Sequence, residues 1–152
     1  MPAKRIAFGS DERSHLTDAI VAELRHRGYD VDLFGALAEG ESPQWADVAR
    51  KVAERVARGD YSQGILCCWT GTGVSIAANK SPGVRAALCI DAETARGARK
   101  WNDANVLCLS LRHTSEAVAK EVLDAWFASS PDPSEQANIE KVKGMDKARV
   151  AG

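Results

Sequence analysis

The 152-residue chain lacks long apolar runs and an excess of charge of either sign. No segment approaches the roughly 18 consecutive apolar residues of a membrane-spanning helix. Residues 1–5 lead directly into a short strand-like segment, without the apolar stretch of a secretory signal. The formal net charge of −1 gives no electrostatic reason to expect a nucleic acid or an anionic membrane as partner. We therefore expect a cytoplasmic protein with no nucleic-acid partner and no membrane partner.

The cysteines and histidines also lack the arrangement of a metal site. Adjacent Cys67 and Cys68 would point to opposite faces of a strand, which makes them a poor pair for a metal or a disulfide. Cys89 and Cys108 lie inside apolar runs and are predicted to be buried. The three histidines show no catalytic grouping. We expect neither a metal nor a cofactor.

What the sequence does contain is an alternation of short apolar segments with longer periodic ones. Strand-like runs are found at 5–9, 30–34, 65–69, 86–90 and 106–110. Helical periodicity is found at 14–28, 43–59, 92–102 and 115–127, and a further helix is expected to start in the glycine-rich segment after the third run. This order predicts an α/β fold, Rossmann-like and doubly wound, with a five-stranded parallel sheet and helices on both faces.

The second of these helices is expected to begin with Pro43 in its first turn and Ser42 as its N-cap. The residues predicted to point inward are Trp45, Val48, Ala49, Val52 and Val56.

We expect a single domain over residues 1–152, with an α/β core at 1–130 and a helical extension at 131–152. Residues 130–133 contain two prolines and break the chain, and an amphipathic segment follows from residue 134 to about 147. Its apolar face is formed by Ile139, Val142 and Met145. Because this face is separated from the core, the helix is expected to pack on a partner subunit rather than on its own sheet.

The richest candidate site follows the third strand, where Thr70-Gly71-Thr72-Gly73-Val74-Ser75 carries glycines at alternate positions. Ligands of parallel sheets bind beyond the carboxyl ends of the strands. Alternate glycines let successive N–H groups turn inward at the start of the next helix, where they hold phosphate, carboxylate or an oxyanion. From the residues alone, a structural turn is equally compatible. Cys68 precedes this loop, and a thiolate there could be a nucleophile or a general base.

Other strand ends supply further polar residues. Asp11 and Glu12 follow the first strand and could bind hydroxyls or move protons, although an acidic helix cap is equally compatible. Arg112 follows the fifth strand and is a candidate anion ligand. Trp101 and Asn102 are assigned to the same edge of the sheet.

The segment Ile65–Lys80 closely resembles the signature of the ribose-5-phosphate isomerase B and galactose-6-phosphate isomerase family. The resemblance extends to residues 6–11, 82–86 and 102–107 and runs through nearly the whole chain. It implies metal-free aldose–ketose isomerisation of a sugar or sugar phosphate through a cis-enediolate. It also implies a homodimer or tetramer with the active site at the subunit interface.

The resemblance assigns roles to individual residues. Cys68 would be the thiolate base that moves a proton between C1 and C2, and the backbone of Gly71–Ser75 would hold the enediolate oxygens. Thr70 would assist ring opening or orient the sugar. Asp11 and Asn102 would contact its hydroxyls.

The chain departs from the family pattern at several of these positions. Glu12 and Trp101 stand where histidines are usual, and Ser134 and Asn138 align with a pair of phosphate-binding arginines. Of the usual cations, Arg112 remains. We therefore predict an isomerase whose substrate is not ribose-5-phosphate.

Two alternatives remain open from the sequence. Glu12 could be the main acid/base group in place of the absent histidines. The chain could instead be a non-catalytic domain that binds a sugar or nucleotide, with Trp69 and Trp101 closing the pocket or stacking on the ligand.

Overall fold

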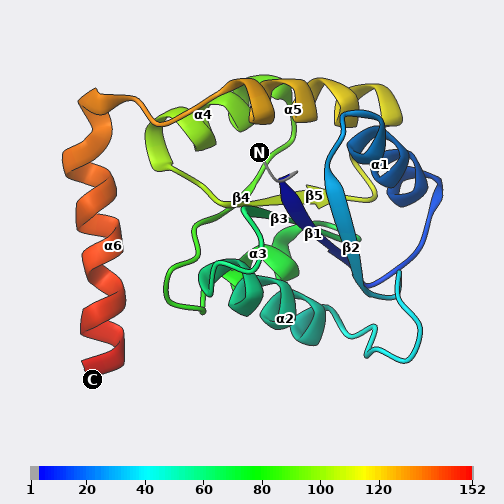
Figure 1. Ribbon diagram of the computed structural model, residues 1–152, viewed down its shortest axis with the longest axis horizontal. Coiled ribbons are helices and arrows are strands. Elements are labelled where there is room, and N and C mark those ends of the chain that lie inside the picture. The colour runs from blue at the N-terminus through cyan, green and yellow to red at the C-terminus, as the bar shows by residue number, and fades with distance from the viewer. Residues whose placement is uncertain (1–3, 152) are drawn as a thin grey trace.

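The computed structural model describes residues 4–151, with side chains up to Lys147. Its sheet has five parallel strands in the order β2-β1-β3-β5-β4 (Figure 1). The strands are β1 (Arg5–Ser10), β2 (Asp30–Gly35), β3 (Gln63–Cys68), β4 (Ala86–Leu88) and β5 (Val106–Ser110). The helices are α1 (His15–His26), α2 (Trp45–Ala57), α3 (Thr72–Ala78), α4 (Ala92–Asn102), α5 (Glu116–Ala128) and α6 (Gln136–Ala151), the last preceded by a 3₁₀ turn at Pro133–Glu135. None of these described helices is long and apolar enough to cross a bilayer.

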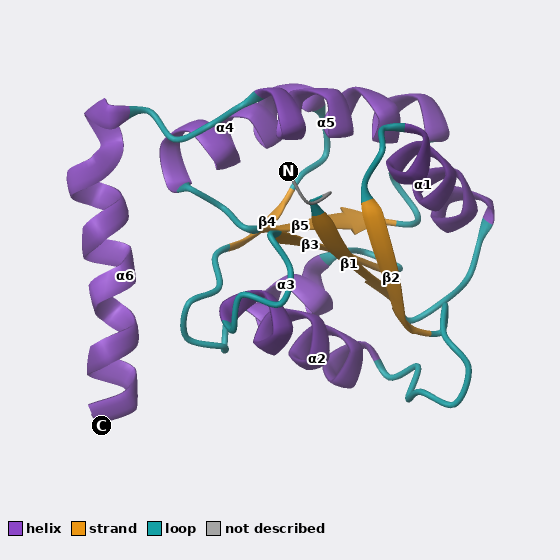
Figure 2. Ribbon diagram, viewed as in Figure 1, coloured by secondary structure: helices purple, strands orange, loops and turns teal. Residues whose placement is uncertain are grey.

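Helices cover both faces of the sheet, which confirms the predicted doubly wound α/β fold (Figure 2). On one face α1, α4 and α5 bury a cluster that includes Phe8 and Trp126. On the other face α2 and α3 bury a second cluster that includes Val52 and Leu66. Each strand contributes alternate side chains to the two clusters because successive side chains of a strand point to opposite faces.

Cys67 and Cys68 point to opposite faces of the sheet, and Cys89 and Cys108 are buried, as predicted. Cys67 and Cys89 belong to the α1/α4/α5 cluster, whereas Cys68 and Cys108 belong to the α2/α3 cluster. All four are free and buried. Burial raises the pKa of Cys89 to about 12 and also raises the pKa values of Cys67 and Cys108, so these three remain neutral thiols.

The strand order reverses between β1 and β3, where the chain winds in opposite directions on the two sides. In open parallel sheets, such a switch point leaves a crevice at the carboxyl ends of the strands. Here the loop that follows Ser10 and the loop that follows Cys68 flank the switch point, and the Asp11 N–H donates to the Cys67 carbonyl at 3.4 Å. The fold therefore brings together two of the strand ends to which the sequence assigned chemistry.

Three predictions about α2 are wrong. Its N-cap is Gln44 rather than Ser42, so Pro43 precedes the helix instead of lying in its first turn. The Ser42 hydroxyl lies 2.7 Å from a carboxylate oxygen of Asp47. Trp45 is 46% exposed rather than part of the core, although Val48, one turn later, is buried. The helix begins at the carboxyl edge of the sheet, so its first residue projects over the strand ends instead of onto the sheet.

The fourth strand is shorter and more exposed than its apolar sequence predicts. It covers only Ala86–Leu88 and pairs with β5 alone, at the edge of the sheet. Its three side chains are half-buried, and Ile90 just beyond it is 64% exposed. A continuous apolar run predicts burial on both faces, but it does not distinguish a central strand from an edge strand.

The last helix, α6, stands beyond β4 at one end of the sheet, apart from both helix layers (Figure 1). The expected separation from the core is only partial, because Ile139 is buried against the chain's own body. Val142 and Met145, on the same predicted face, are 46% and 61% exposed. A groove of about 720 Å³ runs between α6 and the body. An apolar surface of α6 is thus left available to another molecule.

Candidate active site

The glycine-rich loop is held tightly against the neighbouring strand. Gly71 is the N-cap of α3 with φ +78°, a conformation that favours glycine. A Cβ atom at this position would lie 2.5 Å from Leu88 Cδ1 and 3.1 Å from the backbone of Leu109. The loop between β3 and α3 therefore has a fixed backbone that only glycine permits at this point.

The start of α3 presents a set of unengaged backbone donors. The first cap hydrogen bond runs from the Ser75 N–H to the Gly71 carbonyl, at 3.3 Å. The N–H groups of Thr72, Gly73 and Val74 precede it and have no helical partner. The Thr70 and Thr72 hydroxyls lie 2.8 Å apart at the exposed rim. This arrangement can hold an anion or a developing oxyanion.

Cys68 ends β3 immediately before this loop and is 5% exposed. Its carbonyl accepts a hydrogen bond from the Leu111 N–H at 3.0 Å, and the Trp69 carbonyl accepts one from the Arg112 N–H at 3.0 Å. These bonds join the loop after β5 to the loop after β3. Arg112 is exposed beside the glycine loop and forms no ion pair with any side chain that the structure describes.

The loop after β1 adds a carboxyl group with an unusual environment. Asp11 Oδ1 is buried and has no hydrogen-bond partner. Burial, and then the charge of neighbouring Glu12, raises the pKa of Asp11, so its carboxyl group keeps a proton to a higher pH than usual. The turn is fixed by Ser10, whose hydroxyl donates to the Glu12 carbonyl at 2.6 Å. Asp11 is thus free to exchange hydrogen bonds or protons with a ligand, while Glu12 is exposed.

Trp101 and Asn102 are not part of this edge, which corrects their placement by sequence. They end α4, and β5 begins four residues later at Val106, which pairs with Gly64 at the start of β3. Cys68 pairs with Ser110 at the opposite end. Four residues of strand span about 13 Å, so one chain does not bring Asn102 to Cys68.

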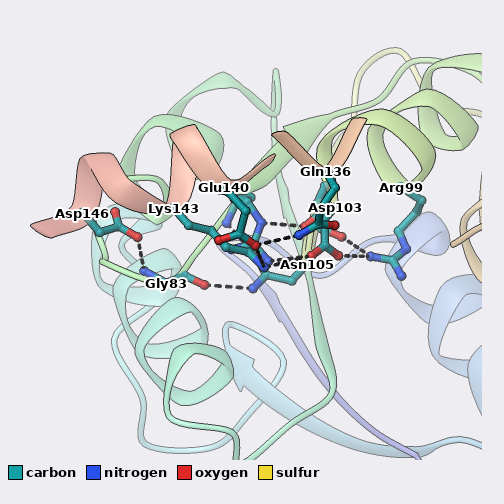
Figure 3. Close-up of polar contacts among 10 residues, drawn as sticks. Gly83, Arg99, Asp103, Asn105, Gln136, Glu140, Lys143 and Asp146 are labelled. Atoms are coloured by element: carbon teal, nitrogen blue, oxygen red, sulfur yellow. Dashed lines mark hydrogen bonds and ion pairs between the residues drawn. The ribbon is translucent and has the colours of Figure 1, made fainter. Parts of the chain in front are cut away.

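An ion cluster holds Asp103, the residue after Asn102, in a left-handed conformation with φ 49° (Figure 3). Its carboxylate lies 3.5 Å from Arg85 Nη2, 3.4 Å from Arg99 Nη1 and 3.6 Å from Lys143 Nζ. Arg85 Nε also donates to the Asp103 carbonyl, at 2.7 Å. Through Lys143 the cluster links the end of α4 to α6.

A second polar contact fixes α6 to the body near this cluster (Figure 3). Asp146 accepts a hydrogen bond from the Gly83 N–H at 2.8 Å, and the Gly83 carbonyl accepts one from Asn105 at 2.9 Å. The cluster and this contact together set where Trp101 and Asn102 lie relative to α6.

We expect Asp103→Ala to lower the free energy of unfolding by about 2–4 kcal/mol, because it leaves two mostly buried arginines unpaired and strains the left-handed residue. Asp103→Asn tolerates this conformation and should cost about half as much. Urea unfolding followed by circular dichroism measures both values. Glu93→Ala, which removes an exposed ion pair with Arg96, is the control and should cost less than about 1 kcal/mol. An equally small loss in Asp103→Ala would show that the cluster is not stabilising.

A residue that the sequence placed in the core lies beside the glycine-rich loop. The indole of Trp45 packs on Gly73, where an added Cβ would lie 3.0 Å from ring atom Cε3. Apolar periodicity places Trp45 on the buried stripe of α2 and cannot show that the first turn extends past the strand ends. A usable signal was its position at the very start of a helix that follows a strand's carboxyl end.

The chain matches the family model described as Ribose/Galactose Isomerase over residues 6–145. The chain belongs to this family. It is 37% identical to ribose-5-phosphate isomerase B of Escherichia coli (strain K12) over 148 residues, 96% of this chain and 99% of that protein. It is 39% identical to D-erythrulose-4-phosphate isomerase of Pectobacterium atrosepticum over 123 residues, 80% of this chain and 81% of that protein.

Solved structures agree with this family membership. Ribose-5-phosphate isomerase B of Clostridium thermocellum superimposes with a TM-score of 0.87 at 35% identity, over 95% of this chain and 99% of that one. The resemblance found in Ile65–Lys80 is therefore confirmed at the level of the family and the fold. Among the residues that the structure describes, no group of three or more His, Cys, Asp and Glu side chains is arranged to hold a metal ion.

Proposed function

We propose that the protein is an aldose–ketose isomerase of sugar phosphates, with Cys68 as the base. The observation that carries this proposal is the position of Cys68 beside the free N–H groups of Thr72–Val74 at the switch point of the sheet. We call the N–H groups of Thr72, Gly73 and Val74 the oxyanion cradle. Proton transfer through an enediolate requires a base next to such a group of donors. The names of the relatives support the same reaction type.

In the forward direction, the Cys68 thiolate takes the proton from C2 of the aldose, and the electron pair moves to the carbonyl oxygen. The resulting cis-enediolate is held by the N–H groups of Thr72, Gly73 and Val74. The Asp11 carboxyl group, with its raised pKa, donates its proton to O1 and takes the proton of the C2 hydroxyl, and Thr70 orients the chain. The Cys68 thiol then returns the proton to C1, which yields the ketose and regenerates the thiolate.

The complete site is proposed to lie between two copies of the chain. The Cys68 edge of one copy would meet Trp101 and Asn102 of the other, because a single chain holds these residues at opposite edges. Large apolar side chains surround the Cys68 edge, where Trp69, Ile76 and Ile90 are 55–64% exposed. Such exposure is typical of surfaces that another subunit covers.

The substrate is proposed to be a short sugar phosphate that reacts in its open-chain form, rather than ribose-5-phosphate. Glu12 and Trp101 occupy the positions where the resemblance expects imidazoles. A four-carbon sugar phosphate does not close a stable ring, so it needs no ring-opening group. Arg112 is the cation beside the glycine loop that would bind the phosphate.

The proposal is tested by incubating the protein in D₂O with four-, five- and six-carbon aldose and ketose phosphates. We expect NMR to show interconversion and deuterium at the carbon next to the carbonyl, fastest for the four-carbon pair. A folded protein that neither turns over nor labels any member of this panel would contradict the proposal. Equal rates for ribose-5-phosphate would contradict the substrate assignment alone.

A further inference from the structure

The start of α2 packs closely against the carboxyl edge of the sheet. A Cβ on Gly9, near the end of β1, would lie 2.7 Å from Val48 Cγ1. A Cβ on Gly35, at the end of β2, would lie 2.4 Å from Val48 Cγ2. The absence of side chains at these two positions lets α2 pack close to the strand ends, with its first residue, Trp45, beyond them.

The indole of Trp45 then lies against the oxyanion cradle. An added Cβ on Gly73 would be 3.0–3.2 Å from three atoms of the six-membered ring. Gly73 is the middle one of the three residues whose N–H groups are free. Cys68 is in the same buried cluster as Val48 and Val74, the neighbours of Trp45 and Gly73 along their helices. The indole is therefore on the same face of the sheet as the Cys68 side chain, beside the donors of the cradle.

Trp45 packs on Gly73 with only part of its ring, and the rest of the side chain is exposed. It is 46% exposed, and its indole N–H has no hydrogen-bond partner among the described residues. Trp126, by contrast, is fully buried and donates its indole N–H to Gln63 at 3.0 Å. An aromatic ring with an open apolar surface and a free N–H is suited to contact a ligand that is part apolar and part polar.

We propose that Trp45 forms a wall of the substrate cleft and determines the length of the sugar it accepts. This inference rests on the proposed isomerase function and adds a specificity-determining residue to it. The ring stacks on the C–H face of the carbon chain, and its N–H is free for a hydroxyl or phosphate oxygen. Because the ring lies against Gly73, in the middle of the three donor residues, it would favour a short carbon chain over a longer one.

Kinetics of Trp45→Ala with four- and six-carbon sugar phosphates test this role. The KM for the four-carbon substrate should rise about 3- to 10-fold, the loss expected for one aromatic contact, with kcat nearly unchanged. The ratio of kcat/KM for the six-carbon over the four-carbon substrate should increase. Trp45→Phe keeps an aromatic wall and should restore most of the KM. Thermal unfolding of all three proteins checks that the variants are folded.

Tryptophan fluorescence tests the contact without turnover. Titration with 4-phospho-D-erythronate, a stable carboxylate analogue of the four-carbon enediolate, should change the emission of the native protein, and Trp45→Phe should lose most of that change. Unaltered KM, chain-length preference and fluorescence response in the Trp45 variants would overturn the inference while the isomerase function stands. If the native protein has no isomerase activity, the proposed function fails, and the titration alone decides whether Trp45 contacts the ligand.

Discussion

Replacing Cys68 by alanine is expected to lower kcat by about 10³- to 10⁴-fold, near the upper end of what one acid–base group contributes. The thiol is at the end of β3 beside the cradle, and no other cysteine reaches that loop. Cys67 points to the opposite face, and burial keeps Cys89 and Cys108 protonated. Deuterium exchange at the substrate carbon next to the carbonyl measures the proton-transfer step directly and should disappear with turnover.

Cys108→Ala is the matched control for this experiment. Cys108 lies on the neighbouring strand and belongs to the same buried cluster as Cys68, so its loss creates a comparable small cavity without removing the base. It should retain most of the activity.

Glu12→Gln tests Glu12 as the alternative acid–base group. We expect this variant to lower kcat less than Cys68→Ala does. Full deuterium exchange in Cys68→Ala would rule out Cys68 as the base. Full exchange there together with its loss in Glu12→Gln would assign that role to Glu12.

The sequence predicted the central part of the fold, and it pointed to the candidate site, because the decisive signals are local. Buried strands such as β3 and β5 are continuous apolar runs, and β5 has the bounds that its sequence predicts. Cys68 and the glycine-rich loop are consecutive in the sequence, so their pattern can be recognised without knowing which other segments pack against them. Asp11 could be assigned because parallel topology brings the carboxyl ends of neighbouring strands together.

The remaining errors concern where a residue lies along an element rather than which element it belongs to. Trp101 and Asn102 were assigned to the carboxyl edge because they follow β4, yet the eleven residues of α4 carry the chain about 16 Å back toward the amino edge. Trp45 has the periodicity of a core residue, but it precedes the part of α2 that covers the sheet. Apolar periodicity reports which face of a helix is apolar and not how far the neighbouring element extends.

The separation of Cys68 and Asn102 within one chain leads to a second prediction with a large effect. Cys68→Ala and Asn102→Ala should each be poorly active alone, the second by at least about 10-fold because a hydrogen bond to a sugar hydroxyl is lost. When the two variants are unfolded together and refolded, activity should return to about a quarter of the native level. Half of the resulting dimers are mixed, and each mixed dimer has one site free of both substitutions.

The control for this complementation is a mixture of two variants whose substitutions both lie at the carboxyl edge of the sheet. Cys68→Ala and Asp11→Asn alter residues that one chain already brings together, so every site of their mixed dimer carries a defect and no activity should return. Differently tagged chains, captured in sequence, measure how many mixed dimers form. If mixed dimers of Cys68→Ala with Asn102→Ala form and stay inactive, Asn102 does not complete the site of the partner. In that case each chain would form its active site from its own residues at the carboxyl edge of the sheet. The exposed Trp69, Ile76 and Ile90 would then surround a complete site.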